Sequence, residues 1–290
     1  MQIDVKELTY NYGQNSKTSS SVALDGVSLT IKEGAFFGII GQTGSGKSTF
    51  VQHLNGLIKL TKNNGSIKIG DYDLADKKCD FVGLRSRLGM VFQYPEYQLF
   101  AETVFDDVAF GIKNFMGDVT EEEKENLVRS AIETVGLNYL EIKDKSPFEL
   151  SGGQKRRVAI AGVIVTKPEI LVLDEPVAGL DPAGKRDFIN LLHTLHSSFV
   201  KTIILVSHDM DLIADNCTEV AVFSHGKIVK TGTPEQVFSD GEEVKSLGLE
   251  LPLTAYLIEE LKNRGVKIES KLSVEKFIGS VKQYGNGGNE

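Results

Sequence analysis

The 290-residue sequence predicts an α/β fold with a mostly parallel core sheet, an antiparallel N-terminal β layer, a helical insertion and a small α-helical C-terminal appendage. Two patterns support this prediction. Short apolar runs that suit buried parallel strands alternate with segments of helical periodicity through most of the chain. Near the N-terminus, apolar and polar residues alternate instead, as they do in half-buried antiparallel strands. We therefore expect an α/β domain over residues 1–235 and an appendage over residues 236–290.

The elements follow this order from the N-terminus. Residues 3–12 and 22–31 have the alternating pattern of paired strands, and a polar, serine-rich loop over 15–21 separates them. The apolar run 35–40 predicts a buried strand, and a helix follows over 49–57. The later strands are expected over 66–74 (a strand or a hairpin), 88–92, 170–173, 202–206, 220–224 and 227–231.

Helical periodicity dominates two further regions. The pattern from residue 103 to about 165 includes an acidic helix capped at Thr120, and it forms the helical insertion of about residues 95–165. Another helix is expected over 183–196. In the appendage we expect short amphipathic helices over 242–264 and 273–284, and we expect the polar tail 285–290 to be disordered.

Composition excludes several classes of protein. The net charge of −8 argues against a nucleic-acid partner and against a polybasic membrane anchor. No apolar run approaches the roughly 20 residues that cross a bilayer, so we expect contact with a membrane only through partners. The N-terminal MQIDVKEL predicts no export signal, and the two cysteines are expected to be reduced, inert thiols.

A glycine-rich loop follows the apolar run 35–40. It reads GQTGSGKST and fits the phosphate-loop pattern G-x-x-x-x-G-K-[ST]. Glycines let consecutive backbone N–H groups turn towards a polyphosphate, and the next helix points its positive end at the same anion. We expect Lys47 to reach the β- and γ-phosphates of ATP and Ser48 to bind Mg²⁺. The predicted nucleotide-binding residues of this loop are Gly41, Gln42, Thr43, Gly44, Ser45, Gly46, Lys47, Ser48 and Thr49.

A pair of carboxylates ends the apolar run 170–173. In the sequence ILVLDEP, Asp174 is expected to hold Mg²⁺ and Glu175 to orient the attacking water. A metal and a water-orienting acceptor are both needed for hydrolysis of a phosphate anhydride. The pattern therefore predicts an ATPase, although such a pair could also be a helix cap.

A second anion-binding loop lies about 100 residues after the first. The sequence LSGGQ places Ser151, Gly152 and Gly153 at the start of a helix, with Gln154 next. Together with the two preceding motifs, this loop resembles the signature of ATP-binding cassette (ABC) proteins. That resemblance implies a P-loop ABC ATPase in which Ser151, Gly152, Gly153 and Gln154 complete the nucleotide site of a partner subunit.

The resemblance assigns further residues in order along the chain. Gln93 matches the glutamine that senses Mg²⁺ and water, and Asp181 in AGLD matches the loop that crosses the dimer interface. His208 in SHD matches the switch histidine that contacts the γ-phosphate. Tyr12 lies where the family places an aromatic ring on adenine, and Tyr10 is the alternative. Glu175, His208 and Gln93 are thus the catalytic candidates, and Ser48, Gln93 and Asp174 are the metal candidates.

The segment VFQYPEYQLFAETVFDDVAFG narrows the resemblance to the ATPases of energy-coupling factor (ECF) transporters, and most of all to the second, A-prime member of each ATPase pair. This implies a peripheral protein on the cytoplasmic face of the cell membrane that powers uptake of vitamins or other micronutrients. The implied partners are a second, homologous ATPase subunit, expected to be a paralogue, a transmembrane coupling subunit, and exchangeable substrate-binding membrane subunits that select the solute.

Two readings stay open beside these assignments. Tyr94, Tyr97, Leu99 and Phe100 form either an exposed surface that receives a helix of the membrane subunit or part of the hydrophobic core. The C-terminal helices support either dimer pairing or regulation. The competing function is a soluble ABC ATPase that acts on DNA or ribosomes, which the single cassette and the short spacing between the two anion loops disfavour. A kinase-like P-loop enzyme is disfavoured by LSGGQ and SHD.

Overall fold

The computed structural model describes residues 1–13, 21–61, 63–266 and 272–287. Its N-terminal part contains a four-stranded antiparallel sheet in the order β2-β1-β4-β5. Strand β1 pairs with β2 on one side and with β4 on the other, and β4 continues into β5 as a hairpin. The strands are β1 (Ile3–Tyr12), β2 (Ser21–Ile31), β4 (Ser66–Ile69) and β5 (Tyr72–Asp73).

The second sheet has six strands in the order β10-β9-β3-β8-β7-β6. All neighbours from β9 to β6 are parallel, and only the edge strand β10 runs antiparallel to β9. Its strands are β3 (Phe36–Gly41), β6 (Leu88–Val91), β7 (Ile170–Asp174), β8 (Thr202–Val206), β9 (Glu219–Ser224) and β10 (Lys227–Gly232).

The parallel sheet separates two hydrophobic cores. Because side chains alternate between the faces of a strand, Ile170 and Val172 of β7 point into one core while Leu171 and Leu173 point into the other. The first core lies between the parallel sheet, the antiparallel sheet and α1 (Lys47–Leu54). The second lies beneath the helical region and the helices that follow it. A strand with both faces covered must be apolar throughout, which explains the continuous apolar runs in the sequence.

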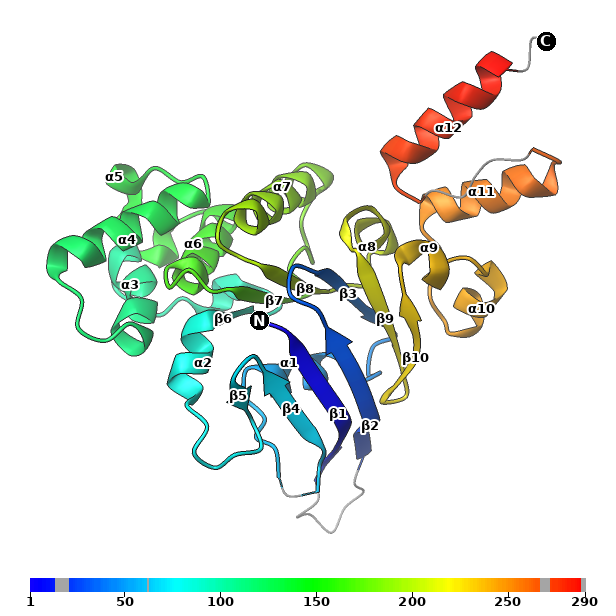
Figure 1. The fold of residues 1–290 in the computed structure, drawn as a ribbon. Helices are drawn as coiled ribbons and strands as arrows, with labels where there is room; N and C mark the ends of the chain where they lie inside the picture. Colours follow the sequence, from blue (N-terminus) through cyan, green and yellow to red (C-terminus); the bar gives the residue numbers. More distant parts are fainter. Residues whose placement is uncertain (14–20, 62, 267–271, 288–290) are drawn as a thin grey trace.

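The helical insertion forms one side of the molecule (Figure 1). Its core is the contact of α3 with α6, which α4 covers. The helical elements of this half of the chain are α2 (Phe81–Arg87), η1 (Pro95–Gln98), α3 (Val104–Phe115), α4 (Glu121–Thr134), α5 (Tyr139–Ile142), η2 (Pro147–Glu149) and α6 (Gly152–Ile164).

The remaining helices follow the strands of the second half. They are α7 (Pro182–Ser198), α8 (Met210–Asn216), α9 (Pro234–Val237), α10 (Gly241–Ser246), α11 (Leu253–Asn263) and α12 (Val274–Gly287). Two aspartates of α8, one helical turn apart, hold the last two helices. Asp211 Oδ1 accepts a hydrogen bond from the backbone N–H of Leu253 at 2.7 Å, and Asp215 Oδ1 accepts one from Val274 at 3.0 Å. The appendage is therefore fastened to α8, and α12 projects away from the sheets (Figure 1).

The predicted fold class and strands are confirmed, whereas the expected helices differ from the structure in three respects. The helix expected over 242–264 is two helices, because Gly248 adopts a left-handed φ of +67° and Pro252 precedes α11. The short helices α2, α8 and α9 were not expected. Helix α12 continues to Gly287, into the tail predicted as disordered, whereas residues 288–290 and most of the loop predicted over 15–21 lie outside the described residues.

Candidate nucleotide-binding site

The phosphate loop joins β3 to α1 and depends on glycine at both of its fixed positions. Gly41 and Gly46 have φ values of +151° and +106°, where a side chain is strained. A Cβ on Gly41 would come within 2.3 Å of the Phe223 carbonyl oxygen, and one on Gly46 within 2.4 Å of that of Ala23. Nothing lies within 4 Å of the corresponding point on Gly44. The loop is thus packed tightly behind and open in front, as a cradle for an anion requires.

Lys47 lies at the first position of α1 with its ammonium group turned into this loop. Nζ donates hydrogen bonds to the carbonyl oxygens of Gly41 at 2.7 Å and Gln42 at 2.9 Å. Burial lowers the pKa of Lys47, and the nearby carboxylates of Glu175 and Asp174 act in the opposite direction. A cation held here by carbonyl oxygens is available to a polyphosphate that enters the loop.

Most of the predicted residues meet in one cavity of about 610 Å³. It lies where the carboxyl ends of β3, β6, β7 and β8 reach the same edge of the parallel sheet, the usual ligand position in open α/β sheets. The lining residues are Tyr12, Val22, Ala23, Thr43, Gly44, Gly46, Lys47, Ser48, Thr49, Gln93, Asp174, Glu175 and His208. Val22 and Ala23 were not predicted, because apolar residues of a strand carry no motif that would distinguish them.

The metal candidates at this edge fit a magnesium ion. Asp174 is buried at the end of β7, its pKa is raised by burial, and the hydroxyl of Ser48 donates a hydrogen bond to its carboxylate, which acts against that shift. Its Oδ1 atom has no hydrogen-bond partner among the described residues. The described part of the chain contains no group of three or more His, Cys, Asp or Glu side chains that could hold a metal ion by themselves. The donors are therefore hard oxygens in small number, as for Mg²⁺ sites that rely on substrate phosphates.

Glu175 and His208 come together at the mouth of the cavity. His208 Nδ1 lies 2.8 Å from Glu175 Oε2, and the imidazole is largely exposed. The backbone of Glu175 has a φ of +50°, which is uncommon for a residue other than glycine. The strained backbone holds the Glu175 carboxylate beside the phosphate loop, where it also forms a hydrogen bond with a histidine. A carboxylate in this position is suited to orient a water molecule.

The structure favours Tyr12 over Tyr10 as the residue predicted to stack on adenine. The Tyr12 ring lines the cavity and is 44% exposed, and its hydroxyl lies 3.2 Å from Thr49 Oγ1. Tyr10 is half-buried and packs against the first core. The two rings meet edge to face at 4.9 Å, so Tyr10 supports Tyr12 from behind.

The signature residues do not line this cavity in the described part of the chain. Ser151 caps α6 through a reciprocal pair of hydrogen bonds with Gln154, at 3.0 and 3.3 Å. Gly152 and Gly153 are exposed. Asp181 caps α7 by accepting a hydrogen bond from the backbone N–H of Gly184 at 2.8 Å. These groups present two helix N-termini that are exposed and that lie outside the lining of the cavity.

Three residues of the phosphate loop also stay outside the lining of the cavity. Gly41 and Ser45 are buried beneath the loop. Gln42 points towards the appendage instead, where its Nε2 donates to the Gly248 carbonyl oxygen at 3.4 Å. The loop is therefore in direct contact with the turn that follows α10.

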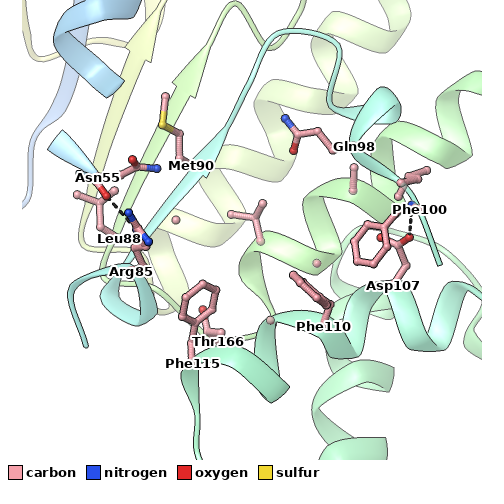
Figure 2. A pocket seen from close by; sticks show the side chains of 16 residues that line it. Asn55, Arg85, Leu88, Met90, Gln98, Phe100, Asp107, Phe110, Phe115 and Thr166 are labelled. Carbon is pink, nitrogen blue, oxygen red and sulfur yellow. Dashed lines mark hydrogen bonds between the residues drawn. The ribbon is translucent and has the colours of Figure 1, made fainter. Parts of the chain in front are cut away.

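A second cavity, of about 300 Å³, lies between α3, α6 and the β6 region (Figure 2). Phe110 and Phe115 border it, and Asp107 holds its rim by accepting hydrogen bonds from the backbone N–H groups of Phe100 and Ala101, both at 2.9 Å. The residues of the neighbouring segment 94–100 differ in exposure, so some of them fit the interpretation as an exposed surface and others the interpretation as hydrophobic core. Tyr94, Tyr97 and Phe100 are 41%, 84% and 58% exposed, so they belong to a surface, whereas Leu99 is only 6% exposed and belongs to the second core.

Comparisons with known proteins agree with this geometry. A family model described as ABC transporter matches residues 24–178. The energy-coupling factor transporter ATP-binding protein EcfA2 of Clostridium tetani is 47% identical over 94% of this chain and 93% of its own length. The protein of the same name from Clostridioides difficile is 49% identical over the same shares.

Solved structures agree as well. CbiO1 of Clostridium perfringens, described as part of the ABC transporter complex cbiONQ, has a TM-score of 0.72 at 37% identity over 89% of this chain and 98% of its own. A dimeric ATP-binding cassette in a post-hydrolysis state, bound to ADP and Pi, has a TM-score of 0.70 at 28% identity over 80% of this chain and 98% of its own.

Proposed function

This chain belongs to the ABC transporter ATP-binding proteins, within the EcfA2 group of energy-coupling factor transporters, and we propose that it hydrolyses ATP to power uptake of vitamins or other micronutrients through a membrane partner. One observation carries the site assignment: phosphate loop, buried aspartate, glutamate and histidine share one cavity. The signature loop of the same chain lies on a separate exposed surface. A site that is complete only when two chains meet suits a machine that opens and closes.

ATP and Mg²⁺ are the cofactors of this family, and the lining of the cavity supports the positions that we propose for them. The backbone N–H groups from Gly41 to Thr49 and the Lys47 ammonium would hold the phosphates, and Tyr12 would stack on adenine. Ser48 and Asp174 would hold Mg²⁺, with Gln93 at the same rim. When bound, Mg²⁺ neutralises charge that develops on the phosphates.

The chemical step falls to residues at the mouth of the cavity. Glu175 orients the attacking water, because its carboxylate accepts hydrogen bonds and is fixed at the end of β7. With His208 Nδ1 engaged by Glu175, the exposed Nε2 is the atom that remains for the γ-phosphate. Gln93 follows β6 and completes the γ-phosphate shell.

The signature surface is the proposed contact with a second, homologous ATPase subunit. Ser151, Gly152, Gly153 and Gln154 would meet the γ-phosphate of the partner, and Asp181 would cross the interface. Their exposure and their absence from the lining of the cavity in their own chain support this role. The relative described as part of the cbiONQ complex and the dimeric cassette suit such an assembly. We infer a paralogous partner, and we assign residues 236–290 as an appendage that supports the pairing.

The cavity in Figure 2 is the proposed contact with the transmembrane coupling subunit. No helix in the described residues is long and apolar enough to cross a bilayer. We propose that a helix of the transmembrane coupling subunit enters beside Tyr97, Phe100 and Phe110, whose exposed rings supply apolar anchors. This places the chain on the cytoplasmic face of the membrane, and exchangeable substrate-binding subunits complete the transporter.

The test of the composite ATPase site is Glu175→Gln. The amide keeps the shape of the side chain but loses its charge, so we expect ATP-trapped dimers and a hydrolysis rate lowered by about 10²-fold or more, a few kcal/mol of barrier. Dimerisation is measured by size-exclusion chromatography with MgATP, in the presence of the ATPase subunit that copurifies. Glu122→Gln, on the exposed face of α4, is the matched control. Near-normal turnover would reassign the role of Glu175, and the absence of any ATP-dependent dimer would contradict the composite site.

The transport role has its own test. Mass spectrometry of the detergent-solubilised complex is expected to find integral membrane proteins bound to this chain. Ribosomal proteins or DNA in their place would support the alternative function instead.

A further inference from the structure

Arg156 lies on α6, five positions after the serine of the signature, and its side chain is almost fully buried. An arginine has five N–H donors, and the structure gives this one five hydrogen bonds. Nε and Nη2 donate to the two carboxylate oxygens of Glu96, both at 3.1 Å. Nη1 donates to the carbonyl oxygens of Pro176 at 3.3 Å and Ala178 at 3.1 Å, and Nη2 also reaches that of Ala178 at 3.1 Å.

The acceptors belong to the two segments that carry the catalytic candidates. Glu96 lies in the short helix η1, three positions after Gln93. Pro176 and Ala178 follow Glu175 directly, in a turn closed by a hydrogen bond from the Ala178 N–H to the Glu175 carbonyl oxygen at 3.2 Å. One guanidinium group therefore fixes the signature helix, the glutamine segment and the turn behind Glu175 relative to one another.

We propose that Arg156 is a positioning residue for hydrolysis, which holds the left-handed backbone of Glu175 in register with Gln93 and with the signature helix of the same chain. The proposal rests on the proposed function, in which Glu175 and Gln93 serve the ATP of this chain while the signature serves that of the partner. Arg156 thereby joins the parts of two nucleotide sites. Its hydrogen bonds in the described structure go to Glu96, Pro176 and Ala178 and to no residue of the phosphate loop, so we expect its effect to fall on the chemical step and to leave ATP binding unchanged.

The geometry requires arginine in particular. A lysine at this position keeps the charge but has three donors on one nitrogen, so it cannot bridge a carboxylate and two carbonyl oxygens in one plane. Burial raises the pKa of Glu96, yet the hydrogen bonds from Arg156 and the backbone outweigh it and hold that pKa below its ordinary value. Glu96 is thus the ionised partner of the pair. Desolvation offsets much of the attraction within a buried ion pair, so we assign this pair a role in geometry and not mainly in stability.

The experiment compares Arg156→Lys with Arg157→Lys in the ATPase assembly that copurifies. Arg157 is the next residue of α6, and its Nη1 donates to the Val135 carbonyl oxygen at 2.7 Å, within the helical region. We expect Arg156→Lys to lower kcat for MgATP at least 10-fold while KM changes less than threefold. Arg157→Lys is expected to keep both values within twofold. In the Glu175→Gln background, the added Arg156→Lys change should leave ATP-dependent dimerisation intact.

The results that would overturn this proposal differ from the result that would overturn the proposed function. A kcat of Arg156→Lys within threefold of the unchanged protein would overturn the proposal, and so would a rise in KM as large as the fall in kcat. If Glu175→Gln alone forms no ATP-dependent dimer, the proposed function fails before Arg156 is tested. Should Arg156→Lys not fold, Glu96→Gln decides: a kcat lowered at least threefold with KM unchanged supports the positioning role, and an unchanged kcat contradicts it.

Discussion

Lys47 and Asp174 are buried groups of opposite charge in one cavity, and burial acts against the charge of each. It lowers the pKa of Lys47 and raises that of Asp174, while each group favours the charged form of the other. In the described structure Lys47 Nζ donates two hydrogen bonds from its three N–H groups, and Asp174 Oδ1 has no hydrogen-bond partner. Groups left in this condition are suited to a ligand that brings both phosphate oxygens and a cation.

Tyr12 is the residue at which adenine stacking can be measured. Tyr12→Ala is expected to weaken ATP binding about 5- to 150-fold, because base stacking on an aromatic ring is worth about 1 to 3 kcal/mol. Tyr12→Phe keeps the ring and loses only the contact with Thr49, so it should bind within about threefold of the unchanged protein. Titration with a fluorescent ATP analogue gives both values. Equal affinity of the alanine variant would move adenine to another part of the cavity.

The sequence predicted the polar residues of this site, because their spacing follows from phosphate and metal chemistry. The sequence did not show that Leu99 is buried while its neighbours are exposed, because a short 3-10 turn has no periodicity that distinguishes buried from exposed positions. The contacts of Gln42 with Gly248 and of Arg156 with Glu96 join segments far apart in the chain, and no local pattern records them.

At the scale of elements, the aromatic segment from Tyr94 to Phe100 gives a paired prediction. Tyr97→Asp is expected to abolish assembly with the membrane subunit and solute uptake, with ATPase activity and stability almost unchanged, because Tyr97 is 84% exposed. Leu99→Asp should lower the free energy of unfolding by several kcal/mol, since it places a charge in the second core. Uptake assays and urea unfolding separate the two effects. Normal uptake by Tyr97→Asp would exclude this surface as the docking site.

An ion pair between Lys185 of α7 and Asp209, the residue after His208, joins helices α7 and α8. Asp209 caps α8 and accepts a hydrogen bond from Lys185 Nζ at 2.7 Å. Burial raises the pKa of Asp209, but the hydrogen bonds from Lys185 and from the backbone N–H of Leu212 outweigh it and hold that pKa below 3.8. A lowered pKa stabilises the fold above the ordinary value, and this contribution is lost as the pH falls through the folded-state pKa.

Lys185→Met should therefore destabilise the fold by about 0.5 to 1 kcal/mol near neutral pH, as expected for a partly exposed pair. The difference from the unchanged protein should shrink as the pH falls below the ordinary pKa of aspartate and through the lowered folded-state pKa of Asp209, because the carboxyl group then becomes protonated in both proteins. Urea unfolding from pH 7 down to pH 3 measures it, and the cost should be smaller in an Asp209→Asn background. A difference that grows in acid would contradict the pairing.

The strands were predicted within one or two residues of their observed bounds. Burial on both faces leaves continuous apolar runs in β3, β6, β7 and β8, whereas alternation of apolar and polar residues marks the half-buried β1 and β2. The helices α2, α8 and α9 have seven residues or fewer, too few for a helical period to show. The break between α10 and α11 depends on one glycine and one proline, which a longer amphipathic pattern concealed.

At the scale of the whole molecule, the phosphate loop and the appendage meet through Gln42 and Gly248. Gly248→Ala places a Cβ 1.6 Å from Gln42 Nε2, so the glutamine must move. Gly265→Ala is the matched control, with a similar left-handed φ of +82° and nothing within 4 Å. We expect both variants to lose about 1 kcal/mol of stability from backbone strain, whereas only Gly248→Ala should change the affinity for ATP, by about threefold or more. Thermal unfolding and nucleotide titration test this, and identical affinities would mean that the contact does not reach the nucleotide.

The two aspartates of α8 that hold α11 and α12 have a mechanical consequence. Helix α8 begins two residues after His208, so a tilt of this short segment during ATP turnover would be transmitted to both appended helices. Helix α12 is 14 residues long and spans about 21 Å. A small rotation where it joins α8 would therefore move its C-terminal end by a much larger distance.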